Sequence, residues 1–552
     1  MIMSRIRKLA EKIIPRFHVQ QLLIGRLFLC AASLMSSAFG QAPDPEDSTK
    51  VLNLTTFATF SAVANSGGID LTHPKDGSGR VFVSTNEGKI HAFSSTGNSL
   101  GTFLDLNTPG VLPDFDSSLG FTTRGLSYMA FHPGYGNAGA SGEGKLYTIY
   151  KTDEPGLRSP DYSAAGLPTK PGNVLSQYAI TEWTVDTNDP NQIDTSSRRE
   201  VIRFEFSGQG EDTHSVGQLA FNPFALPSDP DHGNLYIPLG DSFAGGTVPN
   251  WQHVQDENNP FGKVLRINPL ENGGDAYSIP VDNPFNNGGI LLDNDNNSEE
   301  IAAWGFRYPQ NMSFAKDSGG NARLVVFDIG ADNFEEVNIV DIGDNHGWTR
   351  HDGPDDGNLN TVLNLPAGST LEFPATAYDH VIPNIPGAAP TAGGAAITGG
   401  FVVSDPNDPN FQNQLLFSDL ARGAFFHADF GELVTADATD NQAAMSVMNV
   451  RLDGSAPGGF PSLIGSTRGD ARFGVDESGR LFVISRRTNT IFVSDLIADQ
   501  NPVPEPSTLA LSAIALAVLS GYRGGRYYQY SRRTVISISP NLSPALRRPF
   551  GS

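Results

Sequence analysis

One short phrase recurs along the middle of the chain: a turn residue followed at once by a short run rich in β-branched and aromatic residues. It occurs six times, at 79–83, 144–149, 233–237, 321–326, 413–417 and 479–484. Each copy has the composition of a buried β-strand bounded by a turn. The copies begin about 65 to 90 residues apart, a longer period than the 40–50 residues of common propeller repeats. The repeats predict an all-β fold, a six-bladed β-propeller with long loop insertions over residues 41–500. An array of β-sandwiches is the alternative.

The charge of the chain is unevenly distributed. The formal net charge is −23, but residues 1–40 carry +5 and residues 523–552 carry +6, which leaves −34 on residues 41–522. A body this acidic repels phosphate backbones, so we expect no nucleic-acid partner. Such a charge suits an extracellular protein that tolerates salt or binds cations.

The first forty residues have the pattern of a secretory signal peptide. Five basic residues between Arg5 and Arg16 precede an apolar run from Leu22 to Phe39, and small residues follow at 38 and 40. An uncleaved membrane anchor is the alternative. The one cysteine of the chain, Cys30, lies in this segment. A cleaved chain would therefore hold no disulfide and no cysteine-based site.

The carboxyl end combines three features in order. Val503-Pro504-Glu505-Pro506-Ser507 precedes an apolar run at 509–519, and Arg523 and Arg526 follow. The apolar run is short for a stable membrane span. This order resembles the PEP-CTERM sorting signal of Gram-negative bacteria. The resemblance implies a sorting and anchor segment at 501–526, a partner in the sorting machinery at the membrane, and export to the periplasm, cell surface or extracellular matrix. That family usually ends near its basic cluster, whereas this chain continues as a basic tail over 527–552.

Two loops concentrate acidic and amide side chains, at 293–297 and at 352–357. Asp and Asn at alternate positions can supply oxygen ligands to calcium, but neither loop fits the register of an EF-hand. A solvated turn is the simpler interpretation of both loops.

A histidine and an aspartate are candidates for acid–base chemistry. His214 stands before a strand-like run, and Asp241 follows the predicted strand at 235–237. In a propeller these strand ends meet at the same rim of the axial channel, where an oriented histidine can act as a general base. A histidine in a loop can equally be structural.

Two further clusters follow. Arg307 precedes Tyr308 and Pro309 in an apolar run, so its guanidinium is expected to be partly buried and to need an anionic partner. That partner would be a carboxylate such as Glu299 or Glu300, or a ligand. In the second cluster, 328–338, Gly330 permits close approach of the backbone to a ligand or metal.

The order of these phrases resembles the glucose/sorbosone dehydrogenase family over roughly residues 55–495. The phrases that carry the resemblance include 76–83, 125–133, 235–241, 262–267, 345–348, 399–401 and 473–476. The resemblance implies a six-bladed propeller that binds pyrroloquinoline quinone (PQQ) and Ca²⁺ and oxidises a sugar. Because a haem attachment motif would need cysteine, a separate electron acceptor is expected.

The resemblance also implies roles for single residues. His214 would be the base that takes the sugar hydroxyl proton, Asp241 its orienting carboxylate, and Arg307 a residue that contacts the quinone. Gly330 and Ala331 would bind the cofactor's Ca²⁺ through their carbonyls, and Glu336 would serve a structural calcium site. Further cofactor-binding residues would be Tyr308, Arg422, Arg468 and Arg472.

This chain departs from the family pattern at three of those positions. Ala331 stands where the family usually has a proline, a tolerable change because the carbonyls would bind the ion. Tyr308 replaces an asparagine that contacts the cofactor, and the phrase 420–423 lacks a lysine, for which Arg422 would substitute. A second hypothesis is therefore a propeller that keeps the fold and the calcium but has lost the quinone, and that binds a carbohydrate or surface ligand without catalysis. A hydrolase is a third, since acids abound but no motif places a pair.

Overall fold

The computed structural model describes residues 45–494, except for several loops. The loops left out are 63–65, 117–124, 153–157, 166, 168–173, 209–213, 243–251, 287–297, 332, 355–364, 367–368, 381–394, 405–407 and 409. Contacts group Met1–Ala498 into one unit and Asp499–Ser552 into another. The predictions for the signal peptide, the acidic loop at 293–297 and the segments after 500 fall outside the described residues, as does half of the second acidic loop, residues 355–357.

The described residues are almost entirely β-structure, which confirms the predicted class. The first half contains β1 (Glu46–Thr59), β2 (Gly68–Thr72), β3 (Val81–Thr85), β4 (Lys89–Phe93), β5 (Ser99–Asp105), β6 (Leu126–Phe131), β7 (Lys145–Lys151), β8 (Tyr162–Ser163), β9 (Val174–Val185), β10 (Ile193–Gly208), β11 (Ala220–Phe221), β12 (Leu235–Leu239) and β13 (Lys263–Ile267). The second half contains β14 (Ile301–Trp304), β15 (Pro309–Lys316), β16 (Ala322–Asp328), β17 (Phe334–Val340), β18 (Thr376–Asp379), β19 (Ile397–Val402), β20 (Gln414–Asp419), β21 (Phe425–Asp429), β22 (Ser446–Leu452), β23 (Ala471–Val475), β24 (Leu481–Ser485) and β25 (Thr490–Ser494).

All six recurring phrases are strands, namely β3, β7, β12, β16, β20 and β24. The turn residue before five of them adopts the left-handed conformation, with φ between +61° and +86°, at Gly79, Gly144, Gly233, Asn413 and Gly479. Glycine and asparagine adopt this conformation at little cost, so they begin the strand after a tight turn. The apolar run that follows is buried in every case.

The described strands form four sheets. β6, β7, β9, β10 and β8 make one sheet, β11 to β14 a second, and β15 to β18 a third. The fourth sheet has twelve strands, an arrangement that the repeats do not predict. Two parallel pairings join its parts: β1 pairs with β22 over several residues, and β2 pairs with β23 at Leu71 and Gly474.

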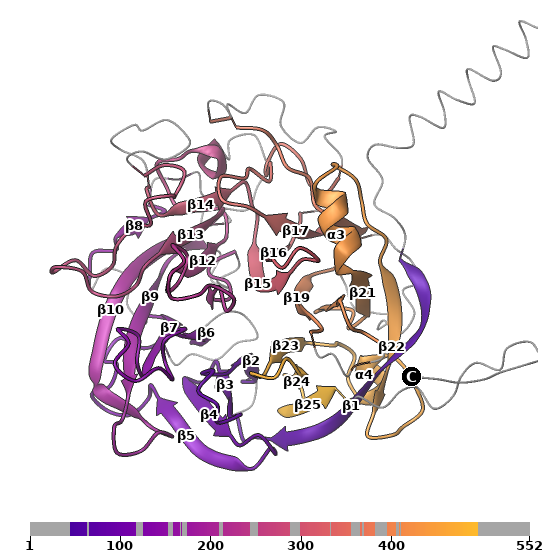
Figure 1. Cartoon of the computed structure of the whole chain (residues 1–552), viewed down its shortest axis with the longest axis horizontal. Coiled ribbons are helices and arrows are strands. Elements are labelled where there is room, and N and C mark those ends of the chain that lie inside the picture. The colour runs from indigo at the N-terminus through magenta and orange to yellow at the C-terminus, as the bar shows by residue number, and fades with distance from the viewer. Residues whose placement is uncertain are drawn as a thin grey trace, which may run out of the picture. The chain divides into compact units, whose positions relative to one another are not determined.

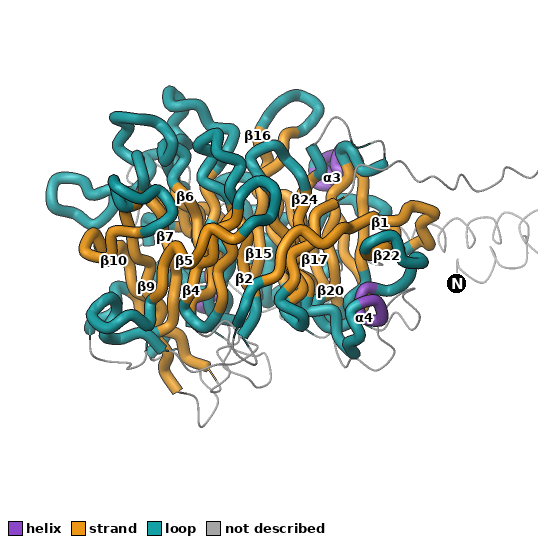
Figure 2. Tube along the Cα trace, turned by 90° about the horizontal axis from the view of Figure 1, so that it is seen from below, coloured by secondary structure: helices purple, strands orange, loops and turns teal. Residues whose placement is uncertain are grey.

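The sheets are arranged around a centre (Figure 1). The strands nearest the centre contact one another in a closed order, β2 to β6, β6 to β11, β12 to β15, β15 to β19, β19 to β23 and β23 to β2. Outer strands such as β5, β10 and β22 lie at the periphery (Figure 1). Seen from the side, loops cover both ends of the strands (Figure 2). The apolar core lies between neighbouring groups of strands, as where Tyr236 and Val264 pack with Met312 and Leu324.

Helices are short in the described part of the chain. They are η1 (Gln252–Gln255), α3 (Phe430–Asp437) and α4 (Phe460–Leu463). Asp429 caps α3 by accepting a hydrogen bond from the Glu432 backbone N–H at 3.1 Å. No helix among the described residues has the length and apolar content that a membrane crossing requires.

Candidate functional site

The structure brings together the predicted histidine and aspartate. His214 Nδ1 lies 2.8 Å from Asp241 Oδ1, and both residues are buried. Burial lowers the pKa of His214 below its ordinary value, and the nearby Arg307 guanidinium acts in the same direction, whereas Asp241 opposes it. The ring is therefore neutral near pH 7, with the Nδ1 proton directed at Asp241 and Nε2 as its basic nitrogen.

The backbone at this pair is unusual. His214 has φ +56° and Ser242, next to Asp241, has φ +55°, in the region that non-glycine residues rarely occupy. Each such residue costs about 1–2 kcal/mol, and this kind of strain gathers at functional sites. Gly240 is required for the close approach, because a Cβ there would lie 2.3 Å from the His214 carbonyl oxygen.

Other contacts hold Asp241 in place. Trp348 Nε1 donates to Asp241 Oδ2 at 2.9 Å, and His253 Nε2 donates to the Asp241 carbonyl at 2.8 Å. The Asp241 backbone N–H donates to the Arg307 carbonyl at 2.8 Å. Both carboxylate oxygens of Asp241 are thus engaged, so the side chain presents a fixed acceptor to His214.

Arg307 and Tyr308 complete the same group of residues. The Tyr308 ring stacks on His214, with 5.2 Å between ring centroids. The backbone N–H groups of Arg307 and Tyr308 donate to the buried Asp328 carboxylate at 2.9 and 2.6 Å. The Arg307 guanidinium lies over Trp348, 5.8 Å from its ring centroid.

The side chain of Arg307 has different partners from those that the sequence suggested. Its guanidinium donates to the carbonyls of Ile329, at 2.9 Å, and of Gly330. The expected carboxylate Glu300 instead accepts from Tyr162 and Tyr277, each at 2.6 Å. The prediction of a Glu300 partner is therefore wrong, because Tyr162 of β8 and Tyr277 of a loop occupy that carboxylate.

The cationic side chains fit an anionic group such as PQQ. Arg307 Nε, Arg422 Nη1 and Arg472 Nε are buried and have no hydrogen-bond partner among the described residues. Unsatisfied N–H groups on buried cations are costly, and a carboxylate ligand would satisfy them. Arg422 donates to the His380 carbonyl, and Arg472 donates to Thr398 Oγ1 at 2.8 Å.

Arg468 stands apart from the other predicted cations. Its side chain is 41% exposed and pairs with Asp470 at 3.3 Å. Arg472, by contrast, is buried and donates to Thr398 Oγ1. Among the described residues, no hydrogen bond or ion pair connects Arg468 with His214, Asp241 or Arg307.

The predicted calcium ligands already have hydrogen-bond partners within the protein. The Gly330 carbonyl accepts from Arg307, and the Ala331 N–H donates to Asp352 Oδ1 at 3.0 Å. Glu336 accepts from the Gly353 N–H at 2.6 Å and from Asn338 at 3.2 Å. No group of three or more histidine and acidic side chains in the described ranges is arranged to hold a metal.

The chemistry near Glu336 nevertheless suits a cation. Burial raises the pKa of Glu336 well above its ordinary value, and the neighbouring Asp328 and Asp352 carboxylates raise it further. Three acidic groups in one buried region repel one another unless a proton or a cation intervenes.

Sequence reasoning assigned no role to three residues at this site: Trp348, His253 and Asp328. Trp348 lies more than a hundred positions from Asp241, so only the tertiary structure joins them. The one signal available was the phrase at 345–348, which is among those that carry the family resemblance.

Comparison with known proteins shows which family the chain resembles. The family model described as glucose / sorbosone dehydrogenase matches residues 68–452. The HIPL1 protein of Arabidopsis thaliana is 26% identical over 504 residues, 84% of this chain and 68% of that protein. Quinoprotein glucose dehydrogenase B of Acinetobacter calcoaceticus is 29% identical over 303 residues, which are 53% of this chain and 52% of that protein.

Solved structures are also similar. The PQQ-bound aldose sugar dehydrogenase from Streptomyces coelicolor has 18% identity and a TM-score of 0.46, covering 82% of this chain and 98% of its own. The apo-form aldose sugar dehydrogenase from Escherichia coli has 16% identity and the same TM-score, with the same coverage. Because the family model spans most of the described strands and the catalytic candidates, the chain belongs to the glucose/sorbosone dehydrogenase family.

Proposed function

We propose that this protein is an exported quinoprotein dehydrogenase that oxidises an aldose or a related sugar alcohol group with PQQ and calcium. The observation that carries the proposal is the buried pair of His214 and Asp241 beside Arg307 and Tyr308. A neutral, oriented histidine is the base that removal of a sugar hydroxyl proton requires.

Each residue has one part in the mechanism. His214 Nε2 takes the hydroxyl proton while Nδ1 remains bound to Asp241. Asp241 stabilises the charged ring that forms, and Trp348 keeps its carboxylate in place. Bound PQQ would supply the acceptor for the hydride of the sugar carbon. Arg307, Arg422 and Arg472 would hold its carboxylates through their unpartnered N–H groups.

Calcium is part of the proposal, with one requirement. For the Gly330 carbonyl to bind the ion, the Arg307 guanidinium has to leave that oxygen and turn to the quinone. Glu336, with Asp328 and Asp352 nearby, would serve a second, structural calcium.

The sheets support a six-bladed propeller. The twelve-stranded sheet divides into three groups of four at its two parallel pairings, and the other three sheets would each be one blade. The last blade would then combine β23, β24 and β25 with β1 from the start of the chain.

A binding protein without catalysis is the second candidate. Two observations favour it: Tyr308 replaces the expected asparagine, and Arg307 occupies a proposed calcium ligand. In that case the propeller would bind a carbohydrate or another surface ligand.

The deciding experiment adds PQQ and Ca²⁺ to the purified protein and measures sugar-dependent reduction of a redox dye. Sugar oxidation that needs PQQ supports the dehydrogenase. Absence of PQQ binding, measured directly by titration, would reject it in favour of the binding protein.

The proposal also covers the predicted signal peptide and the predicted sorting segment. Residues 1–40 would direct export, and residues 501–526 would be handled by the sorting machinery. A separate carrier would take the electrons. Fractionation of the native host, with detection of the protein in each fraction, tests the location.

A further inference from the structure

Lys263 is a lysine in the interior whose ammonium has only carbonyl partners. Its side chain is fully buried at the start of β13. Nζ donates to the carbonyls of His253 and Val254, each at 3.1 Å, and of Phe261 at 2.9 Å. It makes no ion pair with any residue in the described ranges. Burying an ammonium group is costly, and the three hydrogen bonds offset part of that cost. They also hold the three carbonyl groups in fixed positions around Nζ.

The three carbonyls belong to one loop, 252–261, which contains η1. Two side chains of this loop reach the candidate site. His253 Nε2 donates to the Asp241 carbonyl at 2.8 Å, and Gln255 Nε2 donates to the Trp348 carbonyl at 2.8 Å. Gln255 also exchanges two hydrogen bonds with Asn345, at 2.9 and 2.8 Å.

The position of Lys263 in its sheet explains how it reaches this loop. Lys263 pairs with Leu239 of β12 and with Trp304 of β14. Asp241 follows β12 by two residues, and Arg307 follows β14 by three. Lys263 therefore lies at the end of the sheet from which both site residues emerge.

We propose that Lys263 is a positioning residue for the His214 and Asp241 pair. It fixes the loop 252–261, and the loop fixes Asp241 directly through His253 and indirectly through Gln255 and Trp348. The inference deepens the proposed function, since it concerns the orientation of the proposed base.

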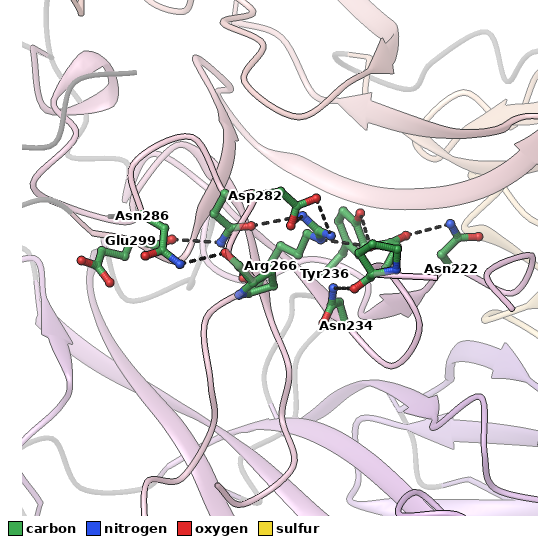
Figure 3. Close-up of polar contacts among 11 residues, drawn as sticks. Asn222, Asn234, Tyr236, Arg266, Asp282, Asn286 and Glu299 are labelled. Atoms are coloured by element: carbon green, nitrogen blue, oxygen red, sulfur yellow. Dashed lines mark hydrogen bonds and ion pairs between the residues drawn. The ribbon is translucent and has the colours of Figure 1, made fainter. Parts of the chain in front are cut away.

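Arg266, on the same strand, is a contrasting case. Its guanidinium is also buried, but it pairs with Asp231 and Asp282, each at 3.0 Å. Figure 3 shows Arg266 directed toward Asp282 and close to Tyr236. These two carboxylates lie in loops, and among the described residues neither makes a hydrogen bond or ion pair with Asp241. Arg266 is thus a matched buried cation with a structural role alone.

The test compares Lys263→Met with Arg266→Met in the full-length protein without cofactor. NMR of histidine-labelled protein reports the His214 Nδ1 proton and the pKa of its ring. In the wild type and in Arg266→Met we expect a protected Nδ1 proton. In Lys263→Met we expect that proton to exchange at least tenfold faster and the ring pKa to fall, because Asp241 no longer supports the charged form.

A second variant covers the case in which Lys263→Met does not fold. Gln255→Met leaves Lys263 intact, removes the contact of the loop with Trp348, and should also speed exchange of the Nδ1 proton. Lys263→Gln, which keeps two N–H donors, should restore part of the protection. The inference is overturned if the folded Lys263 variants keep the wild-type exchange rate, if Arg266→Met speeds exchange equally, or if Gln255→Met leaves it unchanged.

This readout separates the inference from the proposed function. If exchange responds as expected but the wild type oxidises no sugar, Lys263 still positions the pair and the dehydrogenase proposal fails. If sugar is oxidised but the exchange rate of the Nδ1 proton does not respond, the dehydrogenase proposal stands and the positioning role of Lys263 is rejected.

Discussion

His214 Nδ1 and Asp241 Oδ1 lie 2.8 Å apart in a buried site, and Trp348 holds the other oxygen of the same carboxylate at 2.9 Å. Because both oxygens of the Asp241 carboxylate are hydrogen-bonded, the carboxylate holds the His214 ring in one orientation. The other ring nitrogen, Nε2, is then available to act as a base.

Replacing His214 by alanine should abolish sugar oxidation while leaving PQQ binding nearly intact. General-base catalysis contributes about 100- to 10,000-fold, so the turnover number should fall by that factor. Turnover is measured by dye reduction and PQQ binding by titration of the same preparation. Full activity in His214→Ala would reject His214 as the base.

The pKa of His214 should respond to its two charged neighbours in opposite directions. Arg307 lowers this pKa and Asp241 raises it, so Arg307→Gln should raise it and Asp241→Asn should lower it. Since the base acts in its neutral form, the acid limb of activity should move to higher pH in Arg307→Gln if that variant still binds PQQ.

NMR titration of the apo-protein checks the order of the three pKa values without any need for activity. Arg323→Gln is the control, because Arg323 pairs with Asp317 and Asp341 instead. Shifts of the same sign in Arg307→Gln and Asp241→Asn would contradict the assigned electrostatics.

Trp348→Phe should lower both stability and turnover. It removes the N–H that satisfies Asp241 Oδ2, and an unsatisfied buried acceptor costs about 1–3 kcal/mol. Trp304→Phe is the matched control, since the Trp304 Nε1 has no hydrogen-bond partner among the described residues. Denaturant unfolding should show a larger loss for Trp348→Phe, and equal losses would mean that the hydrogen bond contributes little.

Calcium should stabilise the wild type but not Glu336→Gln. An ion that binds only the folded state adds about 2.7 kcal/mol at a concentration of 100 times its Kd. Because burial already disfavours the charge of Glu336, the glutamine variant should fold about as well as the wild type without calcium. Thermal unfolding with and without Ca²⁺ measures the difference, with exposed Asp275→Asn as control. An undiminished calcium effect in Glu336→Gln would remove Glu336 from the metal site.

Leu54→Ala should destabilise the fold through the strand that joins the two ends of the described chain. Leu54 is 1% exposed on β1, which pairs with both β22 and β25. Truncating a buried leucine costs about 2–5 kcal/mol. Thr59→Ala, at an exposed position of the same strand, should change the free energy of unfolding much less. A similar small effect for Leu54→Ala would show that β1 packs loosely.

The residue types and their spacing were enough to predict the fold class. The six turn-plus-strand phrases are local patterns, and a residue such as Gly79 or Asn413 acts on its own neighbours, so each strand could be placed from the chain alone. The sequence also singled out His214 and Asp241 beside predicted strands and Arg307 in an apolar run, and the family resemblance added Tyr308.

The tertiary structure alone decided which of these side chains meet. Trp348 reaches Asp241 across more than a hundred residues, and Arg307 turns to the Gly330 carbonyl instead of Glu300. The pairing of β1 with β22 and β25 likewise joins residues about 400 positions apart. Such contacts depend on how neighbouring sheets pack and on which buried polar groups share hydrogen bonds. Because the partners are far apart along the chain, no local segment of the sequence reveals them.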